Sequence, residues 1–273
     1  MVVFPNAKIN IGLNIVSRRS DGYHNIESIM IPIPWRDILE IVPASGENST
    51  LTINGREVNC PVEKNLVMKA YRAMEKEYQL PPVNIYLHKI IPDGAGLGGG
   101  SADAAFTLIA LNEVFELNAS KEDLAKIAST IGADCPFFIY NTPKLATGIG
   151  TDFSDINLDL KGYKILVIKP QVSVPTAQAY AGVTPCEPST PLKELIMHPI
   201  EEWQNSIAND FEKSIFPIHP IINNIKQTLI EMGADYASMS GSGSAVYGIF
   251  KGDKLAEENV PTFDQCDIFI GNL

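Results

Sequence analysis

Apolar and polar residues alternate near the start of the chain, where residues 7–15 place an apolar side chain at every second position. Successive side chains of a strand point to opposite faces, so this pattern predicts a strand with one apolar and one polar face. The polar face carries Lys8, Asn10, Gly12 and Asn14. Shorter apolar runs predict further strands at residues 26–33, 38–42, 51–53, 84–91, 163–168 and 245–250.

Helical spacing, with apolar residues three and four positions apart, first occurs at residues 65–78, and Pro81 stops it. An alanine-rich segment at 102–116 has the same spacing, as does a segment at 120–131 that opens on Ser120. Two later helices are predicted at residues 200–211 and 218–232. The Pro-, Ser- and Thr-rich residues 170–191 predict a long loop.

The chain has 273 residues, of which 45% are hydrophobic and 19% charged. This composition supplies enough apolar side chain for a folded core and differs from that of disordered chains. Because a typical domain has roughly 100–200 residues, the length predicts two domains. A polar stretch at 155–162 precedes a new strand, so we expect domains at residues 1–159 and 160–273.

The formal net charge of −11 predicts a surface that repels polyanions, and no lysine or arginine cluster offsets it. Nucleic acid is therefore not an expected partner. No apolar run reaches the about 18 residues that a membrane span needs, and the first residues lack a signal-peptide pattern, so no membrane association is expected. The four cysteines lie far apart, as free thiols of a reducing compartment do. We expect a cytoplasmic protein that is a monomer or a weak homodimer.

A glycine-rich segment, Gly94-Ala95-Gly96-Leu97-Gly98-Gly99-Gly100-Ser101, lies between a predicted strand and a predicted helix. In that order the backbone N–H groups of the loop and the N-terminus of the helix converge on one point and favour an anion there. Glycine also lets a phosphate approach the backbone without meeting a Cβ atom. The segment therefore predicts a phosphate-binding loop rather than a flexible surface loop.

Three other phosphate-binding motifs fit this segment poorly. The glycines formally satisfy the dinucleotide-binding pattern, but a second helix at 120–131 follows where that fold requires a strand. No Lys-Ser or Lys-Thr pair follows the last glycine, which excludes a Walker A loop. The His-Arg-Asp and Asp-Phe-Gly motifs of protein kinases are absent from the sequence.

The segment from Pro92 to Ser101 resembles the second motif of the GHMP kinases, which include galactokinase, homoserine kinase, mevalonate kinase and phosphomevalonate kinase. Four further segments are similar to this family and cover nearly the whole chain: Ala7-Lys8-Ile9-Asn10-Ile11, Asp21-Gly22-Tyr23-His24, Gly132-Ala133-Asp134-Cys135-Pro136 and Ser240-Gly241-Ser242-Gly243-Ser244. The resemblance implies an α+β fold in two parts, an N-terminal domain like domain 2 of ribosomal protein S5 and a C-terminal ferredoxin-like domain, with ATP and substrate meeting in the cleft.

The resemblance also implies an ATP-dependent small-molecule kinase that uses Mg²⁺. Within the family, the motifs are most similar to members that phosphorylate the 2-hydroxyl of a cytidine diphosphate-linked methylerythritol. The ATP-binding positions that it implies are Asn65, Pro92, Asp93, Gly94, Ala95, Gly96, Leu97, Gly98, Gly99, Gly100, Ser101 and Ala102. The family commonly has two serines after the glycines, and here the second is Ala102.

By the same resemblance, Lys8 and Asp134 are the catalytic pair, with Asp134 as a general base or an orienting group. The implied substrate-binding residues are Asn10, Tyr23, His24, Thr176 and Tyr180. Ser240, Gly241, Ser242, Gly243 and Ser244 are expected to form a second wall of the active site. No metal ligand is assigned.

Pattern alone favours plainer roles for several of these residues. Lys8 and Asn10 fit the solvent face of an edge strand, whereas Asp134 and Asn65 fit helix caps. The Asp-Gly turn before Tyr23 fits an exposed hairpin tip. The two functional alternatives are a GHMP kinase for another small alcohol and a catalytically silent ligand sensor of the same fold.

Overall fold

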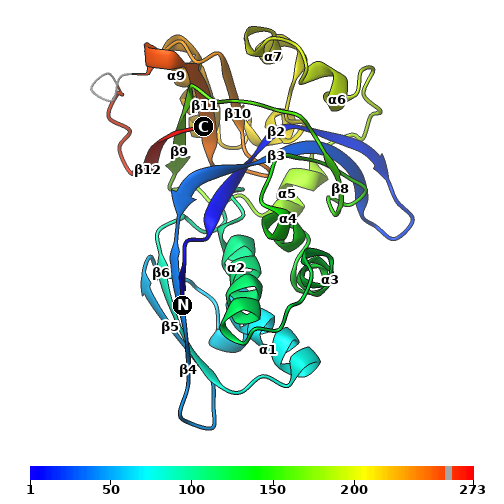
Figure 1. Cartoon of the computed structure of the whole chain (residues 1–273). Coiled ribbons are helices and arrows are strands. Elements are labelled where there is room, and N and C mark those ends of the chain that lie inside the picture. The colour runs from blue at the N-terminus through cyan, green and yellow to red at the C-terminus, as the bar shows by residue number, and fades with distance from the viewer. Residues whose placement is uncertain (256–259) are drawn as a thin grey trace. The chain divides into compact units, whose positions relative to one another are not determined.

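The computed structural model describes residues 1–255 and 260–273 (Figure 1). The chain divides into two compact units and passes between them several times. The first unit contains Met1–Ala7, Trp35–Asp93 and Gly98–Thr142, and the second contains Lys8–Pro34, Gly94–Leu97 and Pro143–Leu273. The boundary expected between residues 159 and 160 falls inside the second unit, and as a domain boundary it stays a prediction.

The first unit contains a sheet with the strand order β1-β4-β6-β5. Its strands are β1 (Val2–Val3), β4 (Ile38–Pro43), β5 (Thr50–Gly55) and β6 (Val83–Lys89). Strand β6 pairs antiparallel with β4 and parallel with β5. Every second residue of β6 is buried, beginning with Val83 and ending with Lys89. The strand thus has one interior face, as its sequence pattern predicts.

The helices of this unit are α1 (Leu66–Tyr78), α2 (Gly99–Val114), α3 (Lys121–Ile131) and α4 (Cys135–Tyr140). Helix α2 contacts the other three helices and also strands β1 and β4 (Figure 1). It can pack closely on all of them because its buried residues include Ala102, Ala104 and Ala105, whose side chains are small. Helix α2 is therefore the centre of this unit.

Helix α2 begins at Gly99 rather than at the predicted residue 102, so its first turn consists of Gly99, Gly100 and Ser101. Glycine is a weak helix former, so the sequence pattern predicted that the helix begins only at the first alanine. The preceding residue, Gly98, has φ 69° and forms the N-cap without a side chain. The last glycines of the loop are thus part of the helix.

The second unit contains two sheets. One has the order β2-β3-β7-β8, formed by β2 (Asn6–Arg18), β3 (His24–Arg36), β7 (Lys144–Thr147) and β8 (Asp152–Asp155). The first residues of β2 and the last residues of β3 belong to the first unit. Strand β2 is longer than predicted, and both of its faces are buried over most of its length.

The other sheet is antiparallel, with the order β10-β11-β9-β12. Its strands are β9 (Tyr163–Pro170), β10 (Tyr236–Met239), β11 (Val246–Lys251) and β12 (Cys266–Asn272). Helix α9 (Pro220–Glu231) packs on β9, β10 and β11 and buries Ile222, Ile225 and Leu229 against them (Figure 1). A spacing of three and four residues puts these three side chains on one stripe of the helix.

Several predictions for this unit were wrong. The expected loop at 170–191 contains helix α5 (Thr176–Ala181), and strands β7, β8, β10 and β12 were not predicted. Two shorter helices, α7 (Ile200–Ser206) and α8 (Phe211–Ile215), replace the predicted helix at 200–211. The chain leaves the helix at Ile207, which is extended at φ −111° and ψ 117°. There the backbone of Leu13 bonds with Ala208 and Asp210, and these contacts with a distant strand replace helical hydrogen bonds.

A short helix, α6 (Leu192–Leu195), and two 3-10 turns, η1 (Val62–Lys64) and η2 (Gly252–Lys254), complete the described elements. None of the helices in residues 1–255 and 260–273 has the length and apolar character to cross a membrane.

Helix α9 offers a matched test of this packing, because Ile225 is 2% exposed and Ile221, on the same helix, is 45% exposed. We expect Ile225→Ala to lower the free energy of unfolding by about 2–5 kcal/mol, since it leaves a cavity under the helix. Ile221→Ala should change it by less than about 0.5 kcal/mol. Urea denaturation of both variants measures the difference, and equal losses would contradict the packing described.

Candidate functional site

The buried polar face of strand β2 carries two of the expected site residues. Lys8 is 3% exposed and Asn10 is 2% exposed, so the alternative of a solvent-facing edge is wrong. The Nζ atom of Lys8 donates to Oδ1 of Asn10 over 2.5 Å. Asn10 in turn donates from Nδ2 to Oγ of Ser28 over 2.8 Å, and Ser28 donates to the carbonyl of Gly12 over 2.7 Å. This chain of hydrogen bonds fixes the position of the Lys8 ammonium group.

The Ser240–Ser244 loop links β10 to β11 and contacts this strand. Ser240 is fully buried; its Oγ accepts from the backbone N–H of Asn10 over 3.3 Å and donates to the carbonyl of Gly96 over 2.8 Å. The hydroxyl of Tyr247, on β11, donates to the Asn10 carbonyl over 2.7 Å. The loop is therefore more than a turn between strands, because it joins Asn10 to the glycine-rich segment.

The first half of the glycine-rich segment, Gly94–Leu97, packs within the second unit. The carbonyl of Leu97 accepts from the N–H of Lys8 over 2.9 Å, and that of Ala95 accepts from Ala245 over 3.1 Å. Gly96 has φ 75°, and a Cβ atom on it would lie 2.0 Å from the carbonyl oxygen of Ser240. Only glycine fits there, so the sequence pattern at this position reflects close contact with the Ser240–Ser244 loop.

The second half of the segment forms the first turn of α2 in the first unit. The N–H groups of Gly99, Gly100 and Ser101 come before the first intrahelical bond, which Ala102 donates to Gly98 over 2.9 Å. No side chain caps this turn. Free N–H groups and the helix dipole together favour an anion at the N-terminus of α2. Ala102 itself is fully buried, so it presents no group to a ligand.

A buried charge cluster that was not predicted lies under this turn. Lys89 binds the carboxylates of both Asp37 and Asp103, with Nζ 2.9 Å from Oδ2 of Asp103. The other oxygen of Asp37 accepts from the N–H groups of Ile90 and Ile91 over 2.5 and 2.8 Å. A Cβ atom on Gly99 would lie 2.9 Å from Nζ of Lys89, so the ammonium group touches the start of α2.

The sequence carried a signal for this cluster. Lys89 is in phase with the apolar residues of β6, which places a lysine on an interior face, and buried lysines are rare unless they are paired. Its partners could not be identified from pattern, since Asp37 lies 52 positions away and Asp103 lies on a helix.

The ionisation of this cluster is unusual because two carboxylates share one ammonium group. Burial and the neighbouring charge of Asp37 raise the pKa of Asp103 to about 7, although Lys89 lowers it. Burial alone lowers the pKa of Lys89, but the charges of Asp103 and Asp37 outweigh it, so the pKa of Lys89 is raised. Oδ1 of Asp103 is buried without a hydrogen-bond partner, which agrees with a carboxylate that is costly to ionise.

The predicted helix caps have different outcomes. Asn65 caps α1, since its Oδ1 accepts from the N–H of Val67 over 2.9 Å. Asp134 occupies the N-cap position of α4, as that alternative predicts, but its side chain makes no capping hydrogen bond. The next residue, Cys135, is buried, and burial raises the pKa of its thiol to about 11, against an opposing hydrogen bond from Ser101. Cys135 is therefore an inert thiol.

The expected aromatic residues lie in the second unit. Tyr23 follows the turn between β2 and β3 and is 63% exposed, as expected of a hairpin tip. His24 stacks on Tyr180, with ring centroids 4.9 Å apart and an angle of 18° between the planes. Thr176 lies one helical turn before Tyr180, and its hydroxyl is 3.3 Å from that of Ser242. The structure thus brings His24 to Tyr180 and Thr176 to the Ser240–Ser244 loop.

The remaining predicted positions lie in the first unit: Asn65, Pro92, Asp93 and Asp134. Because Lys8 belongs to the second unit, its pairing with Asp134 stays a prediction. Within residues 1–255 and 260–273, no group of three or more His, Cys, Asp and Glu side chains is arranged to hold a metal ion.

Residues 65–142 match the family described as GHMP kinases N terminal domain, and residues 192–259 match GHMP kinases C terminal. The 4-diphosphocytidyl-2-C-methyl-D-erythritol kinase of Parabacteroides distasonis is 53% identical and covers 100% of both chains. The enzyme of that name in Bacteroides fragilis is 52% identical over 97% of this chain and 96% of its own.

Solved structures agree with these relatives. A crystal structure of 4-(cytidine 5'-diphospho)-2C-methyl-D-erythritol kinase matches with a TM-score of 0.78 and 32% identity, covering 93% of this chain and 92% of the other. A homoserine kinase from Cytophaga hutchinsonii matches with a TM-score of 0.71 at 18% identity, over 98% of this chain and 94% of its own, which shows a shared fold alone.

The raised pKa of Asp103 has a consequence for stability. An acid whose pKa is higher in the folded state binds its proton more tightly there, so stability falls as pH rises from about 4 to about 7. We expect the free energy of unfolding of Asp103→Asn, which does not titrate, to fall by roughly 3 kcal/mol less than that of the wild type over this range. Urea denaturation at several pH values measures the slope. The control is Glu77→Gln, an exposed carboxylate on α1. A difference between variant and wild type that stays constant with pH would contradict the prediction.

Proposed function

The chain belongs to the GHMP kinase family, and from this premise we propose that it transfers the γ-phosphate of ATP to the 2-hydroxyl of 4-diphosphocytidyl-2-C-methyl-D-erythritol. The products are the 2-phosphate and ADP, and the reaction serves non-mevalonate synthesis of isoprenoid precursors. Relatives of that name share about half of their residues with this chain over 97–100% of its length. The observation that carries the proposal is the buried Lys8–Asn10 pair, which adjoins both the glycine-rich segment and the Ser240–Ser244 loop.

ATP is held by the glycine-rich segment in this proposal. The uncapped first turn of α2 offers backbone N–H groups to the phosphates, and no Cβ atom of Gly99 or Gly100 stands in the way. Lys89 lies beneath this turn but is bound by both Asp37 and Asp103, so the attraction comes from the backbone N–H groups. In a protein with a net charge of −11, such local attraction is what a polyphosphate ligand requires. Asn65, Pro92 and Asp93 are assigned to the adenosine side by the family resemblance.

The transfer step needs positioning and electrostatic stabilisation more than covalent chemistry. Lys8 offsets the negative charge that develops on the transferred phosphoryl group, and the Asn10 and Ser28 side chains hold it in place. Asp134 accepts the proton of the attacking hydroxyl or orients that hydroxyl. Mg²⁺, when bound with ATP, neutralises charge on the phosphate oxygens.

The cytidine end of the substrate is assigned to Tyr23, His24, Thr176 and Tyr180. Aromatic faces are natural partners for a pyrimidine ring, and Tyr23 offers an exposed one beside the stacked His24 and Tyr180. Asn10 is the remaining substrate contact. The Ser240–Ser244 loop contacts both Asn10 and Thr176, so it connects Asn10 to the residues assigned to the cytidine end.

The proposal also covers the location, oligomeric state, domain boundaries and partners of the protein. We infer a cytoplasmic enzyme, a monomer or weak homodimer, with domains at residues 1–159 and 160–273. The acidic charge supports the absence of a nucleic-acid partner.

The substrate assignment predicts a specific turnover. Purified protein with ATP, Mg²⁺ and 4-diphosphocytidyl-2-C-methyl-D-erythritol should release ADP, as followed by a coupled assay. Homoserine and mevalonate should give no turnover above background, because neither carries a cytosine for the aromatic residues to bind. Phosphorylation of one of these alcohols in preference to the cytidine substrate would reassign the protein within its family. No turnover with any of them would support the silent sensor instead.

The catalytic assignment predicts large losses from two substitutions. Lys8→Met and Asp134→Ala should each lower kcat by at least about 10²-fold, because each removes a charge that acts in the transition state. Circular dichroism should show the fold intact. Lys126→Met is the control, since this lysine is 78% exposed on α3 and pairs only weakly with Asp123. Near-normal turnover in both variants would refute the assignment.

A further inference from the structure

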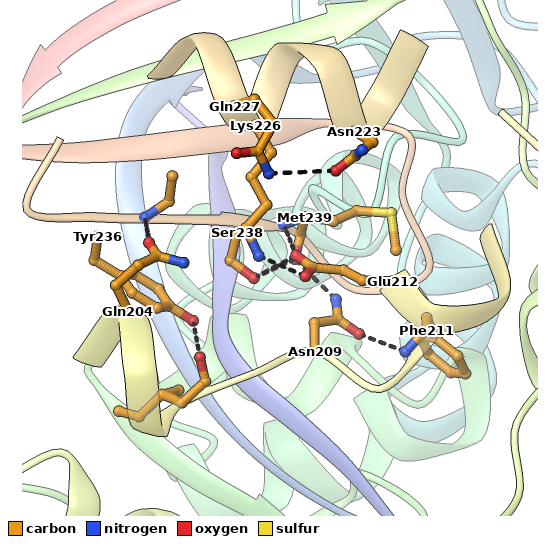
Figure 2. Close-up of polar contacts among 12 residues, drawn as sticks. Gln204, Asn209, Phe211, Glu212, Asn223, Lys226, Gln227, Tyr236, Ser238 and Met239 are labelled. Atoms are coloured by element: carbon orange, nitrogen blue, oxygen red, sulfur yellow. Dashed lines mark hydrogen bonds and ion pairs between the residues drawn. The ribbon is translucent and has the colours of Figure 1, made fainter. Parts of the chain in front are cut away.

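Asn209 and Asp210 end the connection between α7 and α8, and Phe211 and Glu212 are the first residues of α8. This is where the helix predicted at 200–211 breaks, and we call the four residues the 209–212 turn. Their side chains point to different parts of the second unit, as Figure 2 shows for Asn209, Phe211 and Glu212. We propose that this turn positions two parts of the substrate site at once, the Ser240–Ser244 loop and the ring of Tyr180. The proposal rests on the proposed function, since it concerns how that substrate is held.

Asn209 binds the backbone on both sides of Ser240. Its Nδ2 group donates to the carbonyls of Met239 and Gly241, each over 2.8 Å, and its Oδ1 accepts from the N–H of Phe211 over 3.0 Å. The side chain is buried, and both of its Nδ2 hydrogens and its oxygen are used. Two carbonyls on one side require a donor, so an amide fits this position and a carboxylate does not.

Glu212 binds the other backbone polar group of Met239, its N–H, at the end of β10. Oε1 accepts from the N–H of Met239 over 2.8 Å and from the hydroxyl of Ser238 over 3.1 Å, while Oε2 pairs with Nζ of Lys226 over 2.6 Å (Figure 2). The N–H and the carbonyl of Met239 are therefore both bound by the 209–212 turn. Met239 directly precedes Ser240, so the turn sets where the loop begins.

The position of Ser240 matters because its hydroxyl contacts the N–H of Asn10 and the carbonyl of Gly96. A shift of Met239 or Gly241 would move these contacts and, through Asn10, the Lys8 ammonium group. Phosphoryl transfer is sensitive to such shifts, since a misplacement of about 1 Å can cost about 10²-fold in rate.

Phe211 acts on the other part of the site. Its buried ring meets that of Tyr180 edge-on, with centroids 4.9 Å apart and planes at 80°. Tyr180 stacks on His24 with its own face, so Phe211 sets the orientation of the stacked pair. The N–H of Phe211 is bound by Asn209, which links the ring to the loop through a single residue.

Asp210 fastens the turn to strand β2. Its N–H donates to the carbonyl of Leu13 over 2.8 Å, and its Oδ2 accepts from the N–H of Ile15 over 2.9 Å. The 209–212 turn is thus attached to β2, the strand that also carries Lys8 and Asn10. None of these four residues needs to touch substrate, and all act as positioning residues.

The test uses two variants and one matched control. Asn209→Asp keeps the shape but turns a donor into an acceptor facing two carbonyls, and should lower kcat by about 10²-fold. Phe211→Leu should raise KM for the cytidine substrate by about threefold to tenfold, with kcat and KM for ATP unchanged. The control is Gln204→Ala, because Gln204 accepts over 2.8 Å from the N–H of Ala237, which precedes Met239 by two residues on the same strand (Figure 2). It should leave kcat and both KM values unchanged.

Binding of cytidine 5′-diphosphate, measured by calorimetry, gives a readout that needs no turnover. Its dissociation constant should rise in Phe211→Leu by the same factor as KM and stay constant in Gln204→Ala. If the wild type turns over the substrate, two results would overturn this proposal while leaving the proposed function in place. The first is an unchanged kcat in a folded Asn209→Asp or an unchanged KM for the cytidine substrate in Phe211→Leu. The second is a loss in Gln204→Ala as large as in these variants. If Asn209→Asp does not fold, Phe211→Leu decides. A wild type that neither turns over the substrate nor binds cytidine diphosphate would overturn the proposed function and this proposal together.

Discussion

One hydroxyl group, that of Ser240, joins the parts of the second unit on which the proposed chemistry depends. It accepts from the N–H of Asn10 and donates to the carbonyl of Gly96, residues that lie 230 and 144 positions away in the chain. The Gly96 carbonyl can reach it only because Gly96 has no side chain. Strand β2, the glycine-rich segment and the Ser240–Ser244 loop are therefore fixed relative to one another by a contact that leaves no room for adjustment.

The second constraint is electrostatic. A strongly acidic protein that binds ATP must create local positive potential, and in the proposed site it comes from backbone N–H groups at the start of α2 and from Lys8. Lys8 and Lys89 are both buried, and neighbouring side chains bind the ammonium group of each. Lys89 also shows the cost of this arrangement. Its two carboxylate partners compete for one ammonium group, so Asp103 keeps its proton to unusually high pH.

Sequence pattern was reliable where structure depends on neighbouring residues. The strand at the start of the chain, helix α1, helix α3 and the strand–glycine–helix order around Gly96 were all predicted, because periodicity and capping are local. The prediction was wrong where distant contacts override local preference. The helix expected at 200–211 breaks because the backbone of β2 and the end of β10 bind the residues after Ile207 more favourably than another helical turn would. No local signal at Asn209 indicates this.

The sequence by itself determined the two-part α+β composition and the strand–glycine–helix order that predicts phosphate binding. Through five ordered motifs it also determined the family, which the comparisons confirm. Only the tertiary structure decided which polar residues become interior. Lys8 and Asn10 look like a solvent-facing edge in the alternating pattern of β2, yet residues from the Ser240–Ser244 loop and β11 cover Asn10. The physical reason is that burial and hydrogen-bond partners depend on segments far away in the chain, whereas periodicity reports only which residues share a face.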